Sequence, residues 1–163
     1  MMMNMTGNMM VNMILVSACL AGMKTRYDGD SRPDDTIIKM VTAGEALPVC
    51  PEILGGLQTL REASHIEPGC GWDVLEGKSK VITDSGKDVT LEFVRGAEIV
   101  LELASSVGAK KAILKSKSSS CGCGRREQDG VTAALLKKNG IEVLSETDLN
   151  EQKGDFREGK ERE

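Results

Sequence analysis

Short runs of apolar residues recur along the chain and predict β-strands. The runs span residues 13–19, 46–50, 79–83, 111–115 and 141–145. The first run is continuous and ends in small residues, a pattern typical of a strand covered on both faces in a parallel sheet. A proline ends the second run, and a loop rich in glycine and serine follows the fourth. We therefore expect a sheet built from several short strands.

Segments with helical periodicity separate these runs. Residues 34–44 show a short helical pattern, and between 88 and 108 apolar residues recur at steps of three and four, which predicts the longest helix. Asp88 is the predicted N-cap of the long helix, and a glycine lies just past its end. A further helix is predicted over 131–139, with Asp129 as its cap.

The alternation of strands and helices with short connections predicts an α/β protein. The expected architecture is a Rossmann-like open, mostly parallel sheet with helices on both faces. The 163 residues suffice for one domain, which we expect to span 12–147. Residues 52–86 are rich in glycine and predict no element besides the strand at 79–83. Residues 148–163 predict a charged C-terminal tail that is either mobile or a frayed helix.

Composition and charge exclude some classes of function. Aromatic residues make up 2% of the chain, which excludes a surface built to stack nucleic-acid bases. The formal net charge is −4, and this acidic balance argues against a nucleic-acid partner. The apolar run near the N-terminus is too short to span a bilayer and follows no basic residues, so we expect a cytoplasmic protein with no membrane partner.

The cysteines carry the candidate chemistry. Cys19 and Cys50 each end a predicted strand, and Cys121 lies in the loop after the strand at 111–115. Because the carboxyl ends of parallel strands meet at one edge of a sheet, these thiols are expected to converge there. Three thiolates in a reducing compartment favour a soft metal, such as an iron–sulfur cluster.

Other interpretations of the cysteines remain open at this point. A structural zinc module would use Cys19, Cys50, Cys121 and Cys123 as four closed ligands and would have no catalytic activity. A thiol enzyme with Cys19 as its nucleophile lacks an obvious histidine partner, since His65 is the single histidine. A further interpretation is that the cysteines are small buried side chains at strand ends and share no function.

Several segments together resemble one known family. They are 16–22 (VSACLAG), 26–29 (RYDG), 48–52 (PVCPE), 55–57 (GGL), 112–116 (AILKS), 119–122 (SSCG) and 130–136 (GVTAALL). In this order they are similar to the family catalogued as domain of unknown function 523, which includes thiouracil desulfidases. The resemblance implies a [4Fe–4S] cluster held by Cys19, Cys50 and Cys121. It also implies a proton-transfer role for Glu52 and a catalytic role for Ser118, although Ser119 replaces the proline of the family's Ser-Pro-Ser-Cys motif.

The implied reaction is a non-redox desulfuration of thiolated uracil compounds. Thiouracil, thiouridine or thio-UMP would yield the uracil form and hydrosulfide, and the open iron would bind the substrate sulfur. The implied partner is a small thiolated nucleobase or nucleotide, with thiolated tRNA as an alternative that the acidic charge argues against. The oligomeric state is left open.

Charged residues flank two of the motifs. Arg26 and Asp28 predict an ion pair that orders the loop after Cys19, an interpretation favoured slightly over contact with the substrate. Near Cys121, the cationic residues either hold a substrate phosphate or form a solvated basic loop. These residues are Lys115, Lys117, Arg125 and Arg126.

Overall fold

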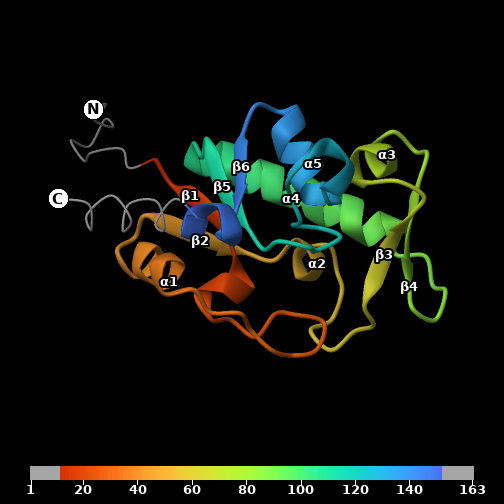
Figure 1. Cartoon of the computed structure of the whole chain (residues 1–163), viewed down its shortest axis with the longest axis horizontal. Coiled ribbons are helices and arrows are strands. Elements are labelled where there is room, and N and C mark those ends of the chain that lie inside the picture. The colour runs from red at the N-terminus through yellow and green to blue at the C-terminus, as the bar shows by residue number, and fades with distance from the viewer. Residues whose placement is uncertain (1–11, 152–163) are drawn as a thin grey trace.

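The computed structural model describes residues 12–151, and its centre is a parallel sheet. Its strands are β1 (Ile14–Ser17), β2 (Ala46–Val49), β5 (Lys111–Leu114) and β6 (Glu142–Ser145), in the order β2-β1-β5-β6. All neighbouring pairs are parallel (Figure 1). β1 lies between β2 and β5, with Leu15 opposite both Leu47 and Ala112. The predicted α/β class and mostly parallel sheet are confirmed.

Helices cover both faces of the sheet. On one face α4 (Thr90–Val107) and α5 (Val131–Lys138) pack through Val100, Ala104 and Leu136 against Leu15. On the other face α1 (Asp35–Thr42) packs through Ile37 in a cluster that contains Val16 and Ile113. Because successive strand residues point to opposite faces, the continuous apolar run of β1 supplies both cores.

The glycine-rich middle segment holds more structure than its sequence pattern predicts. The expected strand at 79–83 is present as β4 (Lys80–Thr83), but it pairs antiparallel with β3 (Ser64–Glu67) in a separate sheet. This sheet lies beside the N-terminal half of α4 (Figure 1) and packs through Val81 against Phe93. The short elements of the chain were not predicted. They are η1 (Ala18–Ala21), α2 (Pro51–Leu54), α3 (Gly71–Leu75) and η2 (Arg126–Gln128).

Two predicted helix caps are wrong. The N-cap of α4 is Val89 rather than Asp88, whose carboxylate instead accepts hydrogen bonds from the amide and hydroxyl of Thr90 at 2.9 and 2.6 Å. The N-cap of α5 is Gly130 rather than Asp129, because the Asp129 side chain turns into the protein to meet other donors.

The predicted C-terminal tail is described only at its start. Residues 146–151 are helical, and Leu149 packs against the cluster that contains Ile37. The remainder of the predicted tail, 152–163, lies outside the described residues. Within the described part of the chain, every helix falls short, in length or in apolar character, of what crossing a bilayer requires.

Candidate active site

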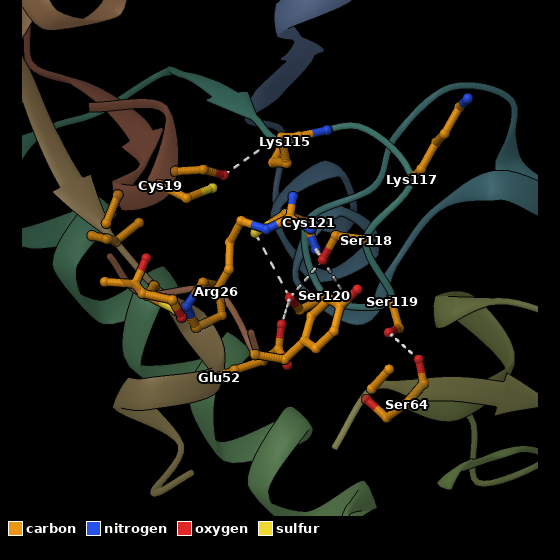
Figure 2. A pocket seen from close by; sticks show the side chains of 18 of the residues that line it. Cys19, Arg26, Glu52, Ser64, Lys115, Lys117, Ser118, Ser119, Ser120 and Cys121 are labelled. Carbon is orange, nitrogen blue, oxygen red and sulfur yellow. Dashed lines mark hydrogen bonds between the residues drawn. The ribbon is translucent and has the colours of Figure 1, made fainter. Parts of the chain in front are cut away.

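A pocket of about 290 Å³ lies at the carboxyl edge of the parallel sheet. The predicted cluster ligands and catalytic residues all line it: Cys19, Cys50, Cys121, Glu52 and Ser118. Cys19 lies in η1 directly after β1, Cys50 follows β2, and Cys121 lies in the loop after β5. Figure 2 shows Cys19, Cys121 and Glu52 facing this common space from different segments. The three adjacent strands thus bring together residues far apart in the sequence.

The three thiols of the pocket lie in a protected environment. Cys19 and Cys121 are buried, and Cys50 is half-buried with its Sγ 3.9 Å from the carbonyl oxygen of Thr25. Burial raises the pKa of Cys19, and the Cys50 thiol raises it further. Burial likewise raises the pKa of Cys121. Thiols of this kind lose their protons when a metal binds, because the thiolate is the ligand.

The donor set fits a soft metal group. Three sulfur atoms from three strand ends are the type of ligand that holds an iron–sulfur cluster. Between residues 12 and 151, no three His, Cys, Asp or Glu side chains are gathered at the spacing of a single metal ion.

The other two cysteines face different surroundings. Cys123 is half-buried and packs against the core cluster of Leu15 and Leu136, and burial raises its pKa to about 11. Cys70 is the N-cap of α3, where its amide donates to Asp73 at 2.8 Å. Cys123 therefore packs against the cluster that also contains Cys121, but it is not among the residues that line the pocket with the other thiols of the zinc-module alternative.

Glu52 is linked to the Cys121 loop by hydrogen bonds. Its Oε1 accepts from Arg61 Nε at 3.1 Å, and its Oε2 accepts from the Ser120 hydroxyl at 3.0 Å. The Ser118 and Ser120 hydroxyl oxygens are 3.1 Å apart, so the three side chains form a continuous chain (Figure 2). Ser118 Oγ also accepts from the amide of Cys121 at 3.1 Å.

Backbone contacts hold the Cys121 loop against α5. The amides of Val131 and Thr132 donate to the carbonyl oxygens of Ser119 and Ser120 at 3.0 and 2.9 Å. A Cβ on Gly130 would lie 2.6 Å from both Ser119 O and Ser120 O, so this close approach requires glycine. The loop conformation is thus fixed although Ser119 stands where proline was expected.

The family model for 2-thiouracil desulfurase matches residues 14–148. The chain belongs to the 2-thiouracil desulfurase family. This confirms the resemblance to domain of unknown function 523 and assigns the chain to a family of enzymes that act on carbon–sulfur bonds.

Two known proteins are similar to this desulfurase-family chain over most of its length. It is 44% identical over 149 residues to YbbK, an uncharacterized protein of Bacillus subtilis (strain 168), covering 85% of this chain and 99% of YbbK. Its structure is similar to that of TudS, a [4Fe–4S]-dependent thiouracil desulfidase, with a TM-score of 0.73 and 39% identity. That similarity covers 90% of this chain and 98% of TudS.

The cationic residues of the desulfurase-family pocket only partly match expectation. Arg26 and Asp28 form the predicted ion pair, with Nε and Oδ1 3.5 Å apart. Lys115 and Lys117 line the pocket. Arg126 instead stacks on the Trp72 ring at 4.0 Å, so the basic residues near Cys121 do not act as one group.

Sequence reasoning missed two residues that contact Glu52. Ser120 directly precedes a predicted ligand, but a run of serines gives no signal of which hydroxyl faces the pocket. Arg61 lies in a segment with no recognisable element, and its contact with Glu52 depends on how loops fold back on each other.

Proposed function

We propose that the protein is a [4Fe–4S]-dependent thiouracil desulfidase. The reaction is hydrolytic: the oxygen of water replaces sulfur on the ring carbon, a carbon–sulfur bond breaks, a carbon–oxygen bond forms, and hydrosulfide leaves without transfer of electrons. The observation that carries this proposal is the meeting of three thiols and the Glu52 hydrogen-bonded chain in one pocket. The family match and the similarity to TudS support it.

Cys19, Cys50 and Cys121 are the proposed cluster ligands. Their position at three adjacent strand ends and the softness of sulfur suit this cofactor. When bound, the cluster supplies an iron with an open position, which is a suitable Lewis acid for a thiocarbonyl sulfur. The remaining chemistry falls to side chains of the chain itself.

Glu52 is the proposed general base and acid. Its Oε1 is held by Arg61, which leaves Oε2 to exchange a proton with the Ser120 hydroxyl. Ser120 in turn contacts Ser118, which faces the same pocket, so a proton taken from water near Ser118 can reach Glu52 through Ser120. The same path run backwards delivers a proton to the departing sulfur or to the ring.

The proposed substrate is a small thiolated uracil compound, namely thiouracil, thiouridine or thio-UMP. The pocket volume of about 290 Å³ suits a small molecule, and the net charge of −4 supports such a substrate over tRNA. A cytoplasmic location suits a protein whose cysteines are all free.

The proposal is tested with protein purified without oxygen and reconstituted with iron and sulfide. We expect a brown protein with about four irons, as [4Fe–4S] clusters contain, that releases sulfide and uracil from thiouracil. Serine substitution of Cys19, Cys50 or Cys121 is expected to remove iron and activity. Cys123→Ser is the matched control because Cys123 is not among the residues that line the pocket. A colourless zinc protein that releases no sulfide would contradict the proposal and favour the structural module.

A further inference from the structure

Two arginines line the pocket, and they use their guanidinium groups differently. Arg61 donates from Nε to Glu52 and from Nη2 to the carbonyl oxygen of Thr25, each at 3.1 Å. Its Nη1 donates to the carbonyl oxygens of Gln58 and Thr59 at 2.8 and 3.1 Å. The Arg61 guanidinium is therefore occupied by the protein and serves to hold Glu52 and the surrounding loops.

The Arg26 guanidinium has fewer partners, since its Nε lies 3.5 Å from Asp28 Oδ1 without forming a hydrogen bond. Its Nε is buried and makes no hydrogen bond to any of the described residues. It is held by the 3.5 Å ion pair with Asp28 and by the Tyr27 ring, whose centroid is 5.5 Å from Cζ. The Arg26 side chain is 19% exposed, and Figure 2 shows it extending into the pocket. A buried donor without an acceptor is unfavourable unless a ligand supplies one.

The other cations of the pocket are engaged or turned outward. Lys115 Nζ pairs with Glu146 Oε1 at 3.1 Å and donates to the carbonyl oxygen of Ser116 at the same distance. Lys117 is exposed. Of the two arginines that line this pocket, Arg26 is therefore the one whose guanidinium is less occupied by the described residues.

We propose that Arg26 binds the carbonyl oxygen that a thiouracil ring retains, and so orients the ring with its sulfur toward the thiols. This inference rests on the proposed function. A guanidinium is a planar donor that stays charged and forms strong hydrogen bonds to oxygen acceptors. Sulfur is a weaker acceptor than oxygen, so Arg26 discriminates a ring with one remaining oxygen from a ring in which both oxygens are replaced. It is thus a specificity-determining residue.

The test measures binding of uracil by calorimetry to the reconstituted protein, which is independent of turnover. In Arg26→Gln we expect the Kd for uracil and the KM for 2-thiouracil to rise by about 10- to 100-fold, as for loss of a charge-assisted hydrogen bond. The preference for 2-thiouracil over 2,4-dithiouracil is expected to disappear. Arg26→Lys, which keeps the charge but loses the planar fork, is expected to restore part of the affinity.

Arg32→Gln is the matched control. Arg32 lies in the same loop and forms an exposed pair with Asp30 at 3.0 Å, and its loss is expected to leave Kd and KM unchanged. Equal iron content and melting temperature in all variants exclude a folding defect. Equal binding of uracil by wild type and Arg26→Gln, with weaker inhibition by hydrosulfide, would overturn the inference because Arg26 would then act on the leaving sulfur. Failure of the wild type to bind uracil and to release sulfide would overturn the proposed function as well.

Discussion

Gly96 of α4 lies so close to Pro51 of α2 that a Cβ on Gly96 would overlap the Pro51 carbonyl oxygen. The approach is reciprocal, since a Cβ on Gly55 would overlap the Glu92 carbonyl oxygen. The glycines at positions 96 and 55 therefore allow the short helix α2 to pack closely against the long helix α4. Because Cys50 and Glu52 belong to the same turn as Pro51, the glycine pair also sets where both reach the pocket.

Gly96→Ala is expected to destabilise the protein. Alanine in a helix ordinarily stabilises by about 0.5–1 kcal/mol relative to glycine, but overpacking against Pro51 costs about 1–3 kcal/mol. We expect a lower free energy of unfolding in urea and a fall in sulfide release. Ser105→Ala in the exposed part of α4 serves as the control and is expected to cause neither change. Unchanged stability of Gly96→Ala would show that α2 can move away without cost.

The hydroxyl of Ser120 is expected to matter for turnover more than for cofactor binding. Glu52→Gln removes the proton acceptor and is expected to lower kcat by about 100-fold or more, whereas Ser120→Ala interrupts its link to Ser118 and is expected to lower kcat by about 10- to 100-fold. Visible spectra and iron counts are expected to match the wild type. Full activity of Ser120→Ala would mean that protons reach Glu52 by another path.

Asp129→Asn is expected to weaken the fold around the Cys121 loop. The buried carboxylate accepts from Trp72 Nε1, Lys137 Nζ and the amide of Gly124 at 2.8, 2.8 and 3.3 Å. Loss of its charge leaves Lys137 without its ion-pair partner, which we expect to cost about 1–3 kcal/mol. Urea unfolding followed by the fluorescence of Trp72, the single tryptophan, measures this cost. Glu127→Gln, at an exposed position of the same loop, is the control.

Glu146 is expected to make the free energy of unfolding depend on pH. Burial alone would raise its pKa, but hydrogen bonds from the hydroxyl and amide of Ser116 and from Lys115 outweigh burial and leave the pKa below the ordinary 4.5. A carboxyl with a lowered pKa stabilises the fold above its unfolded value and loses that contribution as pH falls through its folded value. The stability difference between wild type and Glu146→Gln is therefore expected to be full at pH 7 and to shrink below pH 4.5. A difference that is constant with pH would contradict this.

Elements with strong periodicity or continuous apolar runs could be predicted from the sequence. The four strands of the parallel sheet and helices α1, α4 and α5 are all marked by such patterns. Most elements between Glu52 and Gly86 could not be predicted from the sequence, because these short elements depend on contacts with α4 and α5. Gly71, for example, packs against the backbone of Gly130, a contact that no local pattern encodes.

The candidate site was also predictable in part, where topology rather than side-chain packing determines a residue's position. The convergence of Cys19, Cys50 and Cys121 could be anticipated because the topology of a parallel sheet determines where strand ends lie. The partners of Glu52 could not be anticipated, since side-chain direction in the loops that carry Ser120 and Arg61 is set by tertiary packing. Asp129 shows the same effect. The sequence before α5 predicted that Asp129 is a helix cap, but its buried carboxylate accepts a hydrogen bond from the indole of Trp72 instead.

β1 pairs with both β2 and β5. Cys50 and Cys121, which follow β2 and β5, therefore come close to Cys19 only after these distant parts of the chain have formed one sheet. Such non-local pairings are slow to form. A ligand that needs all three thiols has no binding site in the unfolded chain, and its binding free energy therefore adds to the stability of the native state. Oxidative loss of that ligand is then expected to shorten the lifetime of the folded protein against proteolysis, which couples its abundance to the redox conditions around it.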